Sequence, residues 1–250
     1  MSTVSVFGDE ALAGVRASWL SSPGRAAVIG WFRYLGLVLS GDDGEQTADE
    51  YSLLRREVRA VREPFRLFAS TLRLWRAPRG SCGVMVLPGF STSDRIMAPL
   101  RSYLRTRGHT VWGWGLGTNR GDVDTNLPRV VAQVEKRVEE NGGNAIAMIG
   151  WSLGGVFARE VARTRPELVA QLITLASPAR SYSRAAGDPA ALRIAAPITA
   201  FYSKRDGVVG WRGVIDELNP RVEMIELQSS HLGITLDPTG WLEIAERLGG

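Results

Sequence analysis

Residues 145–159, AIAMIGWSLGGVFAR, join an uninterrupted apolar run to an amphipathic run through Gly-Trp-Ser-Leu-Gly-Gly. The apolar run predicts a buried strand, and the amphipathic run predicts a helix. A serine at such a strand-to-helix turn holds a strained backbone conformation that points its hydroxyl out of the sheet. We expect Gly150 and Gly154 where a side chain would collide with the strand and helix around the turn. The stretch therefore predicts an α/β fold with Ser152 as a nucleophile.

Short β-rich runs alternate with helical runs after residue 80. This alternation is typical of parallel β-α-β units with helices on both faces of the sheet. The pattern predicts an α/β fold with about six mostly parallel strands. The expected strands are 84–87, 110–116, 145–149, 172–176, 198–202 and 222–227, and the expected helices are 93–107, 127–140, 156–163 and 241–248.

Residues 1–80 have a different, unevenly helical pattern. They predict an N-terminal helical extension that packs on a catalytic domain at residues 81–250. In residues 51–79 arginines strongly outnumber acidic residues, and two apolar stripes meet at Pro64. We interpret them as amphipathic helices packed on the core, and the alternative is a weak contact of residues 51–79 with a membrane surface. The stripes are Leu53, Leu54, Val58 and Val61, and then Phe65, Phe68, Leu72 and Trp75.

The composition fits a globular protein that buries a core, with 250 residues of which 44% are hydrophobic. The net charge is +4 and the chain contains no motif for reading nucleic acid, so nucleic-acid binding is not expected. Cys82 is the only cysteine, which excludes an intramolecular disulfide and any cysteine-based metal centre. The chain starts without a secretory pattern, and its longest apolar run, 28–39, is too short to span a bilayer, so we expect a cytoplasmic protein.

Two histidines, His109 and His231, are candidates for the base that activates the serine. His231 follows the last predicted strand, which places it at the C-terminal edge of the sheet with Ser152. His109 precedes a strand, and we expect it to be a surface or capping residue on the opposite edge. Asp206 follows the fifth predicted strand and completes the order Ser, Asp, His, so we expect it to orient His231. The simpler role of Asp206 is to form a turn before Gly207.

A tetrahedral acyl intermediate needs two N–H donors directed at its oxygen. We expect one from Leu153, the residue after the nucleophile, and the other from Phe90 on the loop after the first core strand. The simpler interpretation of that loop is a β-turn that ends the strand. We also expect Trp151, Asn119 and Trp211 near the substrate, Asn119 because it follows the second predicted strand at the same edge.

These motifs together resemble the α/β-hydrolase superfamily, and within it the bacterial esterase and lipase-like members. The similarity covers about residues 80–250. The resemblance implies a serine hydrolase that cleaves small-molecule or lipid-like esters through an acyl-enzyme, with neither a metal nor an organic cofactor. The motifs are LPGF at 87–90, GWSLGG at 150–155, LASP at 175–178, SKRDGVV at 203–209 and SSHLG at 229–233.

Two other functions stay open at this point. An acyltransferase uses the same triad, with an alcohol in place of water as the second nucleophile. A non-catalytic binding protein of the same fold is disfavoured because all three triad positions are filled. A dehalogenase or an epoxide hydrolase is disfavoured because that chemistry needs an aspartate at position 152. The sequence also departs from the superfamily in having Pro88-Gly89 where His-Gly is usual, and in lacking evident first two strands.

Overall fold

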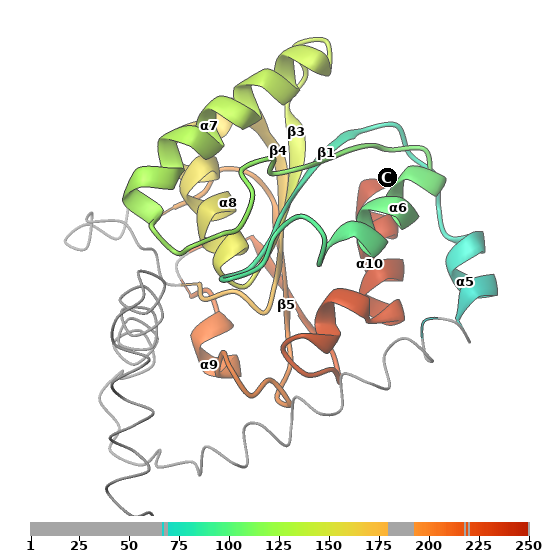
Figure 1. Cartoon of the computed structure of the whole chain (residues 1–250). Helices are drawn as coiled ribbons and strands as arrows, with labels where there is room; N and C mark the ends of the chain where they lie inside the picture. The colour runs from blue at the N-terminus through green and yellow to red at the C-terminus, as the bar shows by residue number, and fades with distance from the viewer. Residues whose placement is uncertain (1–66, 68–69, 180–192, 218, 220, 250) are drawn as a thin grey trace, which may run out of the picture.

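The computed structural model of the chain describes residues 67, 70–179, 193–217, 219 and 221–249. These residues form a six-stranded sheet in which every neighbouring pair of strands is parallel, with helices on both faces (Figure 1). The strand order is β2-β1-β3-β4-β5-β6. The predicted α/β architecture is therefore confirmed.

The strands and helices alternate along the chain in the predicted order, with shifted limits. The strands are β1 (Gly83–Leu87), β2 (Thr110–Gly113), β3 (Ile146–Trp151), β4 (Val169–Leu175), β5 (Ile198–Tyr202) and β6 (Val222–Glu226). The α-helices are α5 (Thr71–Arg76), α6 (Ala98–Thr106), α7 (Val123–Glu140), α8 (Leu153–Thr164), α9 (Trp211–Val214) and α10 (Pro238–Leu248). The short 3-10 helices are η2 (Pro166–Leu168) and η4 (Gly233–Leu236).

Strand β2 ends at Gly113, although its sequence predicts a strand as far as Leu116. The backbone N–H groups of Trp114 and Gly115 donate to the carboxylate of Asp94, at 2.9 and 3.0 Å. That carboxylate also fills the space that a side chain at Gly113 would need. The strand stops because a side chain from a preceding segment takes over its hydrogen bonds.

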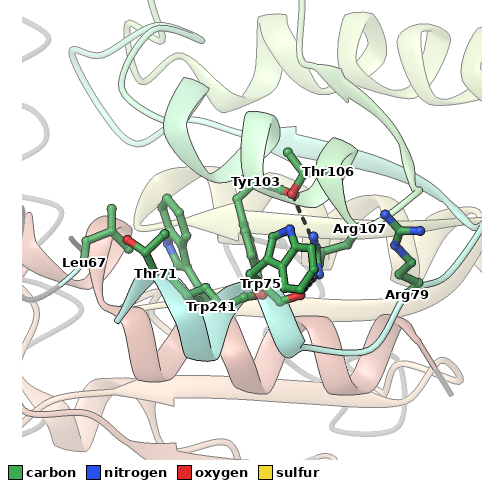
Figure 2. A pocket seen from close by; sticks show the side chains of 9 residues that line it. Leu67, Thr71, Trp75, Arg79, Tyr103, Thr106, Arg107 and Trp241 are labelled. Carbon is green, nitrogen blue, oxygen red and sulfur yellow. Dashed lines mark hydrogen bonds between the residues drawn. The ribbon is translucent and has the colours of Figure 1, made fainter. Parts of the chain in front are cut away.

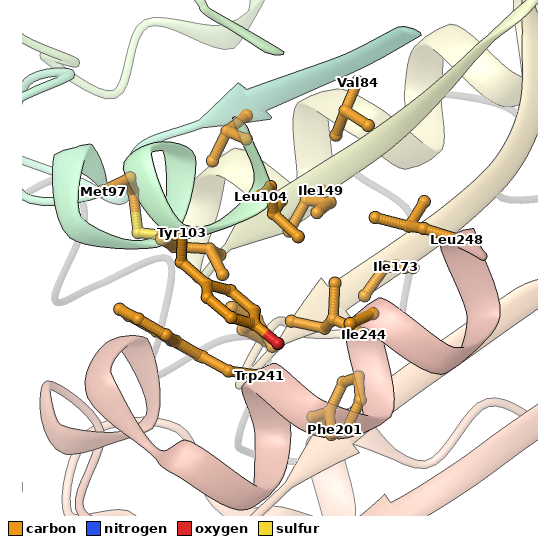
Figure 3. Packing of buried hydrophobic residues seen from close by; sticks show 14 of the residues in the cluster. Val84, Met97, Tyr103, Leu104, Ile149, Ile173, Phe201, Trp241, Ile244 and Leu248 are labelled. Atoms are coloured by element: carbon orange, nitrogen blue, oxygen red, sulfur yellow. The ribbon is translucent and has the colours of Figure 1, made fainter. Parts of the chain in front are cut away.

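Alternate residues of each strand enter two hydrophobic cores on opposite faces of the sheet. In β1, Val84 and Val86 belong to the core that α6 and α10 cover, part of which is shown in Figure 3. Met85 and Leu87 belong to the core that α7 and α8 cover. All five residues of β1 are buried, as expected for a parallel strand covered on both faces.

The chain reverses its direction across the sheet at β1. From β1 it passes through α6 to β2 on one side, and α7 then returns it to β3 on the other side. Ligands of open parallel sheets bind beyond the C-terminal ends of the strands at such a switch point. This rule points to the space between the loop after β1 and the turn after β3.

Helix α5 shares the core of the sheet and does not form a core of its own. Leu74 is buried in the same cluster as Val84 and Leu248. The buried guanidinium of Arg107, at the end of α6, donates to the backbone carbonyl oxygens of Trp75 and Ala77. The residues just before position 80 are therefore tied to the α/β domain.

The predicted packing of Leu72 and Trp75 on the core is wrong. Leu72 is 60% exposed and Trp75 is 69% exposed, while Leu74 faces the core. Leu72 and Trp75 lie three residues apart on one face of α5, and Leu74 lies on the other, so the short helix buries only one of these faces. The rest of the predicted extension, residues 1–66 and 68–69, lies outside the described residues.

Deleting residues 1–79 should destabilise the protein much more than deleting residues 1–69. Only the longer deletion removes Leu74 from the core and takes the Trp75 and Ala77 carbonyl acceptors away from Arg107. Losing a buried leucine and leaving a buried cation unpaired should together cost at least about 3 kcal/mol. Urea unfolding followed by circular dichroism measures the difference, and equal free energies of unfolding for the two deletions would contradict this account of α5.

Candidate active site

Ser152 lies between β3 and α8 in a conformation that L-amino acids rarely adopt, with φ 52° and ψ −122°. Its backbone N–H donates to the carbonyl of Leu175 at the end of β4, at 2.9 Å. Its carbonyl accepts a hydrogen bond of 2.9 Å from the N–H of Gly155. These bonds hold a strained residue in place, and strain of this kind is concentrated at functional sites.

Gly150 and Gly154 are required here because the backbone passes too close for a side chain. A β-carbon at Gly150 would overlap the backbone of Gly155. A β-carbon at Gly154 would overlap the carbonyl of Leu87 at the end of β1. The start of α8 therefore packs directly on the ends of β1 and β3, and the predicted collision at both glycines is confirmed.

His231 and Asp206 form a buried hydrogen-bonded pair, with 2.8 Å between Nδ1 of the imidazole and Oδ2 of the carboxylate. The other oxygen, Oδ1, accepts from the backbone N–H groups of Val208 and Val209, at 2.8 Å each. One carboxylate thus forms the turn and also holds the histidine. An ionised carboxylate only accepts, so this contact suits the imidazole tautomer that carries its proton on Nδ1.

The loop that carries His231 is fixed by Trp151 and by the start of α10. The indole N–H of Trp151 donates to the backbone carbonyl of His231 at 3.0 Å, and the two ring centroids are 5.3 Å apart. The hydroxyl of Ser229 donates to Asp237, whose carboxylate caps α10. These contacts position the imidazole from both sides of the loop, and the sequence motifs did not indicate them.

The other aspartates near this edge have other partners. Asp216 pairs with Arg159 in the interior, with 2.5 Å between Oδ2 and Nη1, and it accepts two further bonds from the amide of Asn219. Burial lowers the pKa of the Arg159 guanidinium, and the nearby carboxylate opposes that shift. Asp188 lies outside the described residues. Among the described aspartates, Asp206 is the one placed against His231.

The loop that carries Phe90 lies against the start of α8. The contact of Gly154 with the last residue of β1 brings the two segments together. As the first residue of the helix, Leu153 has a backbone N–H with no acceptor inside the helix. Gly89 has no side chain, and the β-carbon of Ser152 lies 3.2 Å from where one would begin. Both predicted oxyanion residues are therefore at the edge that carries the serine.

The three predicted substrate contacts have protein partners in the structure. Trp151 is buried and braces the histidine loop. Asn119 is fully buried, with its amide bonded to the protein, so direct contact with substrate is not supported. Trp211 opens α9, where its ring lies 6.3 Å from that of Tyr202 and 4.9 Å from the guanidinium carbon of Arg212. Of the three, only Trp211 is partly exposed.

His109 lies at the N-terminal edge of the sheet, as predicted, but it is not a surface residue. It is 4% exposed because the backbone of Gly80 closes over its ring. Its Nδ1 lies 3.1 Å from Sγ of Cys82. Burial lowers the pKa of the His109 imidazole and raises the pKa of the Cys82 thiol. The two groups form a neutral pair on the edge opposite Ser152.

A cavity of about 680 Å³ opens between α5, α6 and α10 (Figure 2). Tyr103 and Trp241 stack in its wall with ring centroids 5.1 Å apart, and burial raises the pKa of Tyr103 to about 12. None of Ser152, Asp206 and His231 lines it, so we do not place the reaction there.

Within the described ranges there is no cluster of metal-ligating side chains, and no helix there is long and apolar enough to cross a membrane.

The fold and the site together define the class of α/β hydrolases. They combine an open parallel sheet, a strained serine after β3, and an Asp–His pair on the loops after β5 and β6. The profile of the family described as alpha/beta hydrolase fold matches residues 84–217, more than half of the chain, and the chain belongs to this family. The matched range includes Ser152 and Asp206 and ends before His231.

Several curated relatives are esterases that the chain matches over part of its length. Pimeloyl-[acyl-carrier protein] methyl ester esterase of Aliivibrio salmonicida is 32% identical over 115 residues, which is 44% of this chain and 42% of the relative. The Salmonella heidelberg protein of the same name is 33% identical over 100 residues, 39% of this chain and 38% of the relative. The matches thus span about four tenths of these relatives.

The solved structure of monoacylglycerol lipase of Paleococcus ferrophilus has the same fold, with a TM-score of 0.53. The match covers 69% of this chain and 97% of that chain at 17% identity.

Replacing His109 with asparagine should make the free energy of unfolding less dependent on pH. Because the folded-state pKa of His109 is lowered, the unfolded chain binds the proton more readily, and this group destabilises the fold as pH falls below about 6.5. The variant lacks that titration, so its stability should fall less between about pH 7.5 and about pH 5. Urea unfolding of both proteins at the two pH values measures how far the free energy of unfolding falls from the higher pH to the lower. An equal fall in the two proteins would contradict the burial of a neutral imidazole.

Proposed function

We propose that the protein hydrolyses carboxylic esters, with Ser152 as the nucleophile, His231 as the base, and Asp206 as the carboxylate that orients the base. The observation that carries this proposal is the 2.8 Å bond between His231 and Asp206 at the sheet edge that holds the strained serine. Membership of the α/β-hydrolase family and the esterase activity in the names of the curated relatives support it.

In the acylation half, Oγ of Ser152 attacks the carbonyl carbon of the ester while Nε2 of His231 accepts its proton. Asp206 holds Nδ1, which leaves Nε2 as the accepting atom, and it stabilises the imidazolium that forms. The backbone N–H groups of Phe90 and Leu153 donate to the oxyanion. The intermediate then breaks its bond to the alcohol oxygen, which leaves with the proton from His231.

In the deacylation half, His231 removes a proton from water, and the water oxygen attacks the acyl carbon. The second tetrahedral intermediate breaks its bond to Oγ of Ser152, releases the carboxylic acid and returns the proton to the serine. This chemistry uses only groups of the chain and water, so it requires neither a metal nor an organic cofactor.

We propose small-molecule or lipid-like acyl esters as substrates. The curated relatives are named for the methyl ester of an acyl chain on acyl-carrier protein, which supports an aliphatic acyl group here. Leu232, next to His231, is 40% exposed and offers such a chain an apolar contact. An acyltransferase would form the same acyl-enzyme, so products formed in the presence of an added alcohol distinguish transfer from hydrolysis.

Ser152→Ala should abolish hydrolysis of p-nitrophenyl esters because no other group in the proposed mechanism forms the acyl-enzyme. The exposed Ser102, on α6, offers a matched control, and Ser102→Ala should retain wild-type turnover. Turnover on a series of p-nitrophenyl esters and mass spectrometry after treatment with a fluorophosphonate test the assignment. Labelling of a residue other than Ser152, or full turnover by Ser152→Ala, would refute it.

Asp206→Asn should lower kcat by about 10²- to 10⁴-fold while the fold persists. The asparagine oxygen still accepts from Val208 and Val209, but its NH₂ group faces Nδ1 of His231 and favours the imidazole tautomer that cannot accept the serine proton. Asp122→Asn is the control, since either residue caps the N-terminus of α7. Steady-state kinetics of the two variants measure the effect, and a kcat for Asp206→Asn within a factor of about three of the control would contradict this role.

A further inference from the structure

Asn119 lies on the segment between β2 and α7, and it is completely buried beside the loop that follows β1. Its side-chain NH₂ donates to the carbonyl of Pro88 at 2.9 Å. Its backbone N–H donates to the carbonyl of Thr92 at 2.8 Å, and its backbone carbonyl accepts from the N–H of Ser91 at 2.7 Å. One residue therefore holds the loop on both sides of Phe90.

The side-chain oxygen of Asn119 holds the backbone that packs against the Phe90 ring. Oδ1 of Asn119 accepts from the backbone N–H of Gly121 at 3.2 Å. Gly121 has φ +84°, and a β-carbon there would lie 2.8 Å from the Phe90 ring. The bond to Asn119 thus keeps a glycine backbone against that ring, which limits where Phe90 can move.

The loop itself is strained and needs this support. Ser91 has φ 57°, a conformation that costs a residue with a side chain free energy. Its N–H is the group that bonds to the Asn119 carbonyl. A substitution at Asn119 keeps the two backbone bonds but removes the side-chain bond to Pro88, which lies two residues before Phe90, and so frees that side of the loop to shift the Phe90 N–H.

We propose that Asn119 is a positioning residue that holds the Phe90 N–H toward the oxyanion, an inference that rests on the proposed ester hydrolysis. The carboxamide serves both side-chain contacts with two different atoms, because its NH₂ donates to the Pro88 carbonyl and its oxygen accepts from the Gly121 N–H. An aspartate has the same shape and keeps the acceptor, but it places a carboxylate against the Pro88 carbonyl. Asn119 acts on the reaction through the loop and does not contact the substrate.

This role makes a kinetic prediction that a purely structural role does not. The oxyanion forms only after attack on the ester. A displaced N–H donor therefore stabilises the transition state less and leaves the affinity for the substrate nearly unchanged. We expect Asn119→Asp and Asn119→Ala to lower kcat by about 10- to 100-fold with KM changed by less than about threefold. The inhibition constant for a boronic acid, which forms a tetrahedral adduct with the serine, should rise.

The experiment compares Asn119→Asp, Asn119→Ala and Val134→Ala with the wild-type chain, using p-nitrophenyl esters and phenylboronic acid. Val134 is buried in α7 and is absent from the proposed reaction, so its variant controls for a general loss of stability. The midpoint of thermal unfolding is recorded for each protein, and kcat is measured well below the lowest midpoint. Val134→Ala should keep the wild-type kcat at a comparable loss of stability.

The outcomes separate this inference from the proposed function. If the wild-type chain hydrolyses the esters, Ser152→Ala is inactive, and both Asn119 variants keep a kcat within about twofold of wild type, the positioning role is wrong and ester hydrolysis stands. The positioning role is also wrong if Val134→Ala loses as much kcat as Asn119→Asp at a comparable loss of stability. If Ser152→Ala is as active as wild type, the proposed function itself fails.

Discussion

The direct packing of α8 on the ends of β1 and β3 is the constraint on which the arrangement of this edge depends. Gly154 approaches the carbonyl of Leu87, and Gly150 approaches the backbone of Gly155, closely enough to exclude a β-carbon at either glycine. This approach turns the chain sharply at Ser152 and sets the helix N-terminus beside the loop after β1. A helix displaced by one methyl group would move Ser152 and Leu153 away from the loop that carries Phe90.

Carboxylates stabilise the rest of the edge by serving two partners at once. Asp206 uses one oxygen for the backbone of its own turn and the other for His231. Asp237 caps α10 and also accepts from Ser229 on the histidine loop. In each case the side chain that shapes a local turn also binds a second segment. Positions of functional groups are therefore coupled to loop conformation, and a change in either loop moves the imidazole.

The sequence was sufficient to predict the sheet and the pairing of Asp206 with His231. The reason is physical: parallel strands deliver their C-terminal ends to one edge, so Ser152, Asp206 and His231 could be placed together from strand order alone. The glycines at the serine turn could be explained because their constraint is local. Periodicity and local motifs carry this kind of information.

The features that the sequence did not predict depend on contacts between distant segments. Strand β2 ends early because Asp94 takes its backbone N–H groups. His109 is buried because Gly80 closes over it, and Leu72 is exposed because α5 meets the core through another face. Prediction and structure differ most clearly at Asn119. Its position after the second predicted strand suggested a substrate contact, but its hydrogen bonds run to the loop after β1. No periodic pattern encodes such pairings.

The strained backbone positions at this edge are held partly by the sheet and partly by a contact between two loops. Among the described residues, the non-glycine residues with positive φ are Ser91, Ser152 and Ala176, which follow β1, β3 and β4 at the C-terminal edge. Each costs about 1–3 kcal/mol, because L-amino acids rarely adopt a positive φ. Each also donates its own N–H to a neighbouring segment, to the carbonyls of Asn119, Leu175 and Phe201 at 2.7, 2.9 and 2.9 Å. The adjacent strand supplies that acceptor for two of the three, whereas Ser91 depends on a single loop residue. The sheet thus supports the serine turn, while the loop that carries Phe90 is held by Asn119, through its backbone at Ser91 and Thr92 and through its side chain at Pro88.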